Sequence, residues 1–158
     1  MNSRKATARI EQPELEMSIT RTLNVPRDLA FSAWTEPKHL EHWENAPKGF
    51  TVPIHEIDFR PGGAYRLCMR SPEGGDHWLR GVYRDIEKPE RLVFTHTWFD
   101  PQGRSGIESL VTITFADRGQ QTELTLHQSG FQSVAERDGH VDGWNSSLDR
   151  FVEYLSTL

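Results

Sequence analysis

The stretch that decides the fold is SVAERDGHVDGWNSSLDRFVEYL, residues 133–155. Ser133 followed by Glu136 matches a capping box, in which side chains satisfy the free amides at a helix start. Further along, apolar residues recur at helical spacing and form one stripe: Val141, Trp144, Leu148, Phe151 and Leu155. We therefore predict a long C-terminal helix that breaks or restarts at Gly139, and whose apolar stripe needs a large apolar surface to cover it.

The surface available to cover this stripe is a β-sheet. Six expected strands precede the helix, at 51–60, 64–70, 77–86, 91–99, 108–116 and 122–128. Turns such as RPGG at 60–63 separate them, because proline fixes one φ angle and glycine accepts a positive one. Short turns between neighbouring strands predict an antiparallel meander. An alternating strand at 16–23 comes earlier, and two short helices follow it, the first opened by Pro26.

The order strand, two short helices, six strands and long helix predicts an α+β fold. An antiparallel sheet of about seven strands twists and curls around the long C-terminal helix. Because one helix cannot fill the whole hollow of such a sheet, we expect a cavity between them. The length of 158 residues suits one domain, expected at 15–158, and the polar residues 1–14 are expected to form a flexible N-terminal arm.

Composition narrows the classes of function. The formal charge is −5, from 23 acidic and 18 basic residues, which argues against a nucleic-acid partner. The apolar runs are too short to insert into a membrane, and the polar N-terminus does not look like a secretory signal. The lone Cys68 allows neither an internal disulfide nor a thiolate cluster for zinc. We expect a cytoplasmic protein with no cofactor and no metal site.

Four stretches together resemble a known family: ITRTLNVPRDLAFSAWTEPKHLEHW at 19–43, DFRPGGAYRLCMR at 58–70, RGVYRDIEKPERLVFTHTW at 80–98 and SGFQSVAERDGHVDGWNSSLDRFVEYL at 129–155. In this order they resemble the SRPBCC superfamily, within it the branch named after the activator of the ninety-kilodalton heat-shock-protein ATPase. The resemblance runs from about Glu16 to Leu158. It implies the helix-grip fold shared with START-like lipid carriers and polyketide cyclases, a fold that hosts unrelated activities.

Strand alternation selects the side chains that should face the cavity. The strand 91–99 is apolar on both faces, and for it we choose the face with Leu92, Phe94, His96 and Trp98. The alternative for each selected residue is that it simply packs in the hydrophobic core. Polar contacts of buried Tyr and Trp would not argue against this, because such side chains generally find polar partners to avoid a desolvation cost. The expected ligand-binding cavity comprises Trp43, Tyr65, Leu67, Met69, Leu79, Tyr83, His96, Trp98, Phe115, Gln128, His140, Trp144 and Leu148.

An apolar wall with a few polar points is typical of a small-molecule site. The leading hypothesis is therefore a binding module that holds a small hydrophobic or aromatic molecule. A second is an enzyme of the cyclase or hydratase type, in which His96, Tyr83 or Asp85 moves a proton. A third, suggested by the family name, is a chaperone-associated interaction domain whose protein partner meets a row of arginines on the outer sheet face.

Overall fold

The computed structural model of the protein describes residues 15–158, so the arm expected at 1–14 lies outside the described residues. The first strand, β1 (Glu16–Leu23), is followed by the helices α2 (Arg27–Thr35) and α3 (Pro37–Trp43). Six strands and the last helix complete the chain: β2 (Thr51–Ile57), β3 (Ala64–Arg70), β4 (Asp76–Glu87), β5 (Arg91–Phe99), β6 (Ser109–Arg118), β7 (Gln121–Ser129) and α4 (Val134–Leu155).

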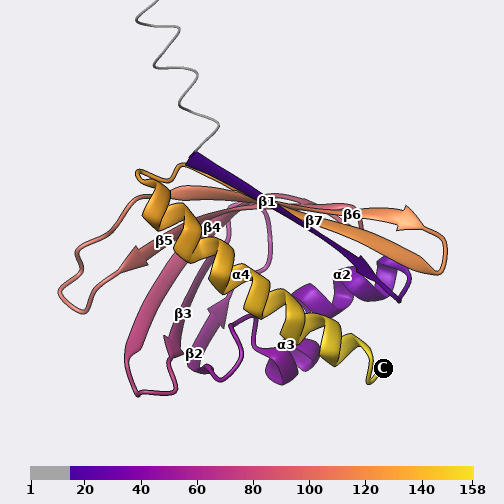
Figure 1. The fold of residues 1–158 in the computed structure, drawn as a ribbon, viewed down its shortest axis with the longest axis horizontal. Helices are drawn as coiled ribbons and strands as arrows, with labels where there is room; N and C mark the ends of the chain where they lie inside the picture. The colour runs from indigo at the N-terminus through magenta and orange to yellow at the C-terminus, as the bar shows by residue number, and fades with distance from the viewer. Residues whose placement is uncertain (1–14) are drawn as a thin grey trace, which may run out of the picture.

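The seven strands of residues 15–158 form one antiparallel sheet in the order β1-β7-β6-β5-β4-β3-β2. Figure 1 shows α4 running diagonally across the sheet, with α2 and α3 near its C-terminal half. The predicted α+β helix-grip fold, with two short helices after the first strand, is confirmed. The strand expected at 51–60 is shorter than predicted. It ends at Ile57 because the backbone turns at 58–63, where the Gly63 amide bonds the Arg60 carbonyl at 2.8 Å.

Helix α4 is continuous, so the break expected at Gly139 is wrong. A glycine in a helix interior costs only about 1 kcal/mol relative to alanine, which the rest of the helix offsets. The hydroxyl of Ser133 accepts a 3.0 Å hydrogen bond from the Glu136 amide at the start of α4. Farther along, the predicted stripe is buried at Trp144, Leu148, Phe151 and Leu155.

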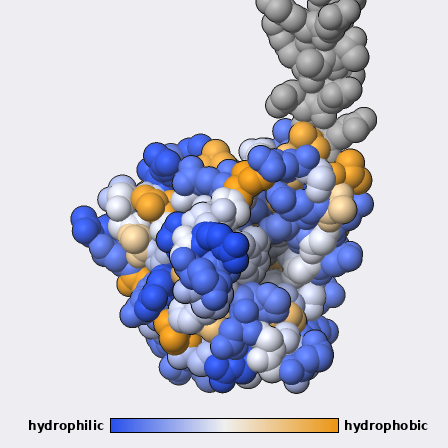
Figure 2. Space-filling view, turned by 90° about the vertical axis from the view of Figure 1, so that its left-hand side faces the viewer, coloured by the Kyte–Doolittle hydropathy of each residue, from blue (hydrophilic) through white to orange (hydrophobic). Residues whose placement is uncertain are grey.

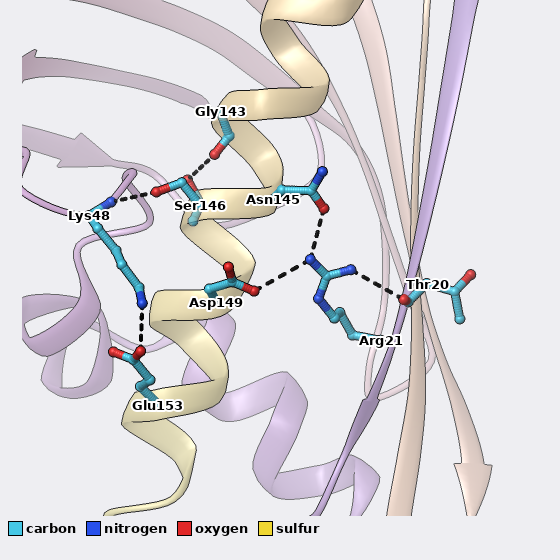
Figure 3. Close-up of polar contacts among 9 residues, drawn as sticks. Thr20, Arg21, Lys48, Gly143, Asn145, Ser146, Asp149 and Glu153 are labelled. Atoms are coloured by element: carbon cyan, nitrogen blue, oxygen red, sulfur yellow. Dashed lines mark hydrogen bonds and ion pairs between the residues drawn. The ribbon is translucent and has the colours of Figure 1, made fainter.

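Polar contacts fasten α4 from both sides (Figure 3). From β1, the Arg21 guanidinium donates to Oδ1 of Asn145 at 2.8 Å. From the loop after α3, the Lys48 amide donates to the Ser146 hydroxyl at 2.9 Å, and its ammonium lies 2.6 Å from Glu153. The helix is thereby attached at one side to the edge of the sheet and at the other to the loop at 44–50.

Within the sheet, Tyr65 on β3 lies over a glycine on β4. Tyr65 pairs in register with Gly81, and its hydroxyl donates a 2.6 Å hydrogen bond to the carbonyl of Thr95 on β5. A Cβ atom at Gly81 would overlap both the Thr95 carbonyl oxygen and the Tyr65 ring. The missing side chain is what lets Tyr65 reach across β4.

Gly81→Ala should therefore destabilise the protein. Because the new methyl group would meet backbone and a packed ring, we expect a loss of about 2–3 kcal/mol in the free energy of unfolding. Urea denaturation measures this loss. The control is Gly106→Ala, whose Cβ would make only an ordinary 3.5 Å contact with the Trp98 carbonyl. Equal stability of the two variants would show that the Tyr65 contact does not depend on Gly81.

Candidate functional site

A cavity of about 380 Å³ lies between strands β2–β5 and the N-terminal half of α4. It exists because the backbone of α4 packs mainly against β1 and α3, away from the β2–β4 side of the sheet. The floor consists of buried side chains, including Leu67, Leu79 and Leu92. The rim is more exposed, with Phe59 at 37% and with Gly139 on α4. One side of the sheet-helix interface is thus closely packed and the other encloses space.

The helix wall of the cavity consists largely of small residues. Ala135, Gly139, Gly143 and Ser147 follow one another at four-residue spacing on α4, and all four line the cavity. That spacing puts them on one face of the helix. A Cβ atom at Gly139 or Gly143 would meet no neighbouring atom within 4 Å. The missing side chains therefore account for much of the open space beside α4.

Aromatic rings form the remaining walls. Trp34 from α2 stacks on Trp144 from α4, with 6.3 Å between ring centroids. On the sheet, the Tyr65 ring lies 5.9 Å from Phe94 and 5.5 Å from Tyr83. Such an enclosure offers flat apolar surfaces to a ligand, and ring–ring contacts contribute beyond the buried area.

A buried chain of hydrogen bonds connects α4 to three strands. The Trp144 indole N–H donates to Oε1 of Gln128 at 2.7 Å, and Nε2 of Gln128 donates to the Ser109 hydroxyl at 2.7 Å. Ser109 in turn donates to the carbonyl of His96 at 3.1 Å. Gln128 is fully buried. Its amide serves to position the helix, and both ends of that amide are engaged.

A second polar contact closes the end of the cavity. The Trp98 indole N–H donates to Nε2 of His140 at 2.9 Å. Because Nδ1 of His140 lies 2.8 Å from the Glu136 carbonyl, which can only accept, that nitrogen carries the proton. Both ring nitrogens of His140 are thus engaged, the imidazole is uncharged in this arrangement, and β5 is joined to the first turns of α4.

His96 carries a buried ring nitrogen without a hydrogen-bond partner. It lines the cavity and is only 4% exposed, and its Nδ1 is buried without a hydrogen bond. The rings of Trp98, His140 and Trp144 surround it at centroid distances of 5.3, 5.6 and 6.1 Å. Burial lowers the pKa of His96 to about 3, so the ring is neutral at physiological pH. Buried polar atoms normally have partners, which makes this one notable.

Of the thirteen side chains expected at the cavity, the structure brings nine together. They are Tyr65, Leu67, Met69, Leu79, Tyr83, His96, Trp98, His140 and Trp144. Leu92 and Phe94 also line it, so the inward face chosen for β5 is the one that the structure shows. That these side chains bind a ligand stays a prediction.

The other four lie in the packed core, which corrects their placement. Trp43, Phe115, Gln128 and Leu148 are buried but do not line the cavity. The reason is that α2 packs against β6 and β7, and α3 packs against α2 and α4, on that side of the molecule. The Trp43 indole donates to the Ala33 carbonyl at 3.0 Å and its ring lies 4.5 Å from that of Phe151. Phe115 meets Phe31 of α2 at 5.4 Å.

Sequence reasoning missed two histidines, one on the edge strand β2 and one on β4. His55 and His77 both line the cavity. Cross-strand register could have identified them, because directly opposed residues share a face. His55 pairs with Leu67 and His77 pairs with Met69, both expected to point inward. The four-residue spacing of small side chains on α4 was a further unused signal. Trp34 and Asn45 could be placed only by the tertiary structure.

The family model of the Activator of Hsp90 ATPase homolog 1-like protein matches residues 24–156, nearly the whole chain. The chain belongs to this family. The resemblance stated from the sequence is thereby confirmed, and with it a fold of the ligand-binding type. Membership of the family specifies no ligand, and no curated protein matches the chain.

Solved structures agree with this family and with the fold. The AHSA1 protein from Silicibacter pomeroyi is 26% identical, with a TM-score of 0.83 over 90% of this chain and 98% of its own. A protein from Chromobacterium violaceum is 25% identical, with a TM-score of 0.79 over 89% and 96% of the two chains. The solution structure of an Arthrobacter aurescens protein, 21% identical with a TM-score of 0.78, covers 92% of this chain and 88% of its own and shows the fold alone.

Two properties of residues 15–158 bear on partners. None of the helices in residues 15–158 is long and apolar enough to cross a membrane. Within the same range, no three His, Cys, Asp or Glu side chains gather where a metal ion could be held. His39 and His42, which are three residues apart on α3, instead contact Tyr154, with Nδ1 of His39 2.6 Å from its hydroxyl.

The buried His96 should make stability depend on pH. Its pKa in the folded protein is about 3 against about 6.5 when unfolded, so below pH 6.5 the unfolded chain binds the extra proton. Stability is therefore lost as the pH falls from about 6.5 toward 3. We expect His96 alone to account for about 2 kcal/mol between pH 7.5 and pH 5.

Urea denaturation of the wild type and of His96→Phe at both pH values measures this contribution. The variant should lose about 2 kcal/mol less than the wild type on acidification. His42→Phe, at an exposed site on α3, is the control and should keep the wild-type dependence. A His96→Phe variant with the full pH dependence would mean that His96 is not held neutral in the folded state.

Proposed function

We propose that the protein binds an apolar or aromatic small molecule in the cavity between the sheet and α4. The observation that carries this proposal is a cavity of about 380 Å³, walled by aromatic rings and lined by His96, whose buried Nδ1 has no hydrogen-bond partner. Its volume lies within the range of about 300–1,000 Å³ typical of ligand pockets. A bound molecule would supply the missing hydrogen bond and displace water from the rings.

The composition of α4 supports this proposal. Gly139 and Gly143 each weaken a helix by about 1 kcal/mol relative to alanine. Nothing in their surroundings requires glycine on steric grounds, because a Cβ atom at either position would meet open space. Larger side chains there would fill the cavity. Glycines on the cavity-facing side of α4 thus make the helix less stable but leave space for a ligand.

The chemistry of the cavity favours binding over proton transfer. With its lowered pKa, His96 is a weak base at neutral pH and acts as a hydrogen-bonding group. Burial raises the pKa of Tyr83, which makes its phenol a weaker acid. Asp85, the third candidate, forms an ion pair with Arg91 at 2.6 Å and does not line the cavity.

The outer face of the sheet offers less to a protein partner than the sequence suggests. Its arginines have partners within the chain, including Arg66 with Glu56 and Arg70 with Asp76, each at 2.8 Å. Arg84 lies 3.9 Å from Glu108. The face drawn in Figure 2, which is the left-hand side of Figure 1, is largely hydrophilic, with apolar residues in separate spots. A protein partner would have to compete with these ion pairs.

Filling the cavity from α4 should abolish binding. Gly143→Phe introduces a ring into the open space, whereas Gly143→Ala adds one methyl group and removes the helix penalty. With the neutral fluorescent probe N-phenyl-1-naphthylamine, we expect saturable binding to the wild type and to Gly143→Ala. We expect at least about tenfold weaker binding to Gly143→Phe, equivalent to about 1.4 kcal/mol.

The alanine variant also controls for folding, since its stability in urea should rise by up to about 1 kcal/mol. Gly143→Phe must unfold cooperatively at a similar urea concentration for the comparison to hold. Unchanged probe affinity in a folded Gly143→Phe protein would place the binding site elsewhere and contradict the proposal.

A further inference from the structure

The wall of the cavity carries no positive charge. Among its lining residues, all within the described part of the chain, there is no lysine and no arginine. The one carboxylate, Glu136, is half-buried in the first turn of α4. Burying an anion without a counter-charge or a full set of hydrogen bonds is strongly unfavourable. The charge pattern of the wall therefore discriminates among ligands.

Several cations on the elements around the cavity are directed elsewhere. Arg150 of α4 donates to the carbonyls of Pro47 and Phe50, at 3.2 and 3.0 Å, in the loop before β2. Lys48 of the same loop is paired with Glu153 on the outside of α4 (Figure 3). The arginines of β3 and β4 lie on the outer face of the sheet, where they pair with carboxylates and hydroxyls. None of these groups is positioned to neutralise an anion in the cavity.

The buried histidines of the cavity do not supply the missing charge. Burial lowers the pKa of His96 and, in the same direction, that of His55. His140 uses one ring nitrogen to donate to the Glu136 carbonyl and the other to accept from Trp98, an arrangement that a doubly protonated ring could not make. His77 is exposed on the rim, where water screens any charge that it carries.

The cavity does contain uncharged hydrogen-bonding groups. Nδ1 of His96 is buried without a hydrogen-bond partner among residues 15–158, and a neutral imidazole offers one donor and one acceptor. The Tyr83 hydroxyl on the neighbouring strand β4 is also without a hydrogen-bond partner in the described chain. Near the other end, Oδ1 of Asn45 is buried without a partner. These groups match a neutral amide, hydroxyl or carbonyl.

Building on the proposed function, we propose that the ligand is an uncharged aromatic molecule that bears a neutral hydrogen-bonding group, which His96 binds. The aromatic walls contact its ring system, and the cavity excludes carboxylates, sulfonates and phosphates of the same size. We therefore expect the cavity not to bind fatty acids or anionic lipids. The residue that sets this specificity is His96, through its neutral donor and acceptor, together with the absence of cations in the lining.

Three probes that share one ring system test this specificity in the full-length protein: naphthalene-2-carboxamide, naphthalene-2-carboxylate and naphthalene. The amide and the carboxylate have nearly the same shape and differ in charge. We expect the amide to bind more than about tenfold tighter than the carboxylate at neutral pH, measured by isothermal titration calorimetry. It should also bind about tenfold tighter than naphthalene, which leaves His96 without a partner.

His96→Phe separates the hydrogen bond from the shape of the cavity. In this variant the advantage of the amide over naphthalene should fall to less than about threefold, while the affinity for naphthalene itself changes little. His127→Phe is the matched control, because His127 on β7 lies outside the cavity and faces Glu16 at 3.4 Å. That control should retain the wild-type preference.

The outcomes distinguish this inference from the proposed function. If the carboxylate binds as tightly as the amide and competes with it, the charge specificity is overturned while ligand binding stands. A retained amide preference in folded His96→Phe would overturn the assignment of His96. Tighter binding of the ammonium analogue, 2-naphthylmethylammonium, than of the amide would show a cation site instead. If neither the amide nor naphthalene binds, the proposed function fails and this inference fails with it.

Discussion

The hydrogen bond from the Trp144 indole to the Gln128 amide determines how α4 sits on the sheet. Its 2.7 Å length and its complete burial mean that leaving it unmade would cost about 1–3 kcal/mol. Gln128 continues the contact to Ser109 on β6, and Ser109 continues it to the β5 backbone. The large Trp144 indole lies between α4 and the strands and holds them apart. Its position leaves the N-terminal half of α4 above open space.

The two halves of the interface between helix and sheet have different compositions. Toward the C-terminus of α4, the rings of Trp34, Trp43 and Phe151 fill the volume from three helices. Toward its N-terminus, the helix presents glycine, alanine and serine to the floor formed by β3–β5. Large side chains at one end hold the elements apart, and small ones at the other end do not fill the gap. The cavity follows from this asymmetry, and the ion pairs of Arg21 with Asp149 and of Lys48 with Glu153 attach α4 to β1 and to the loop at 44–50.

Residue patterns predicted many of the side chains that line the cavity, but they also selected side chains that lie in the packed core. The alternation of β3 and β4 identified Tyr65, Leu67 and Tyr83 as inward-facing, and each of them lines the cavity. The same rule selected Phe115, which is inward-facing too but lies under α2. Alternation states which face of a strand is covered. It does not state whether a helix or an empty volume covers that face, because this depends on where α2 and α3 pack.

By itself, the sequence determined the order of the elements, the course of the sheet and the buried stripe of α4, since each of these is encoded in local periodicity and turn residues. Only the tertiary structure decided which inward side chains meet open space, and that His96 lies among three rings without a hydrogen-bond partner. The physical reason is that a cavity and an unpaired polar atom are properties of contacts between distant segments. Hydrogen bonds through Gln128 and Ser109 connect α4 to β5, and no local pattern along the chain predicts this connection.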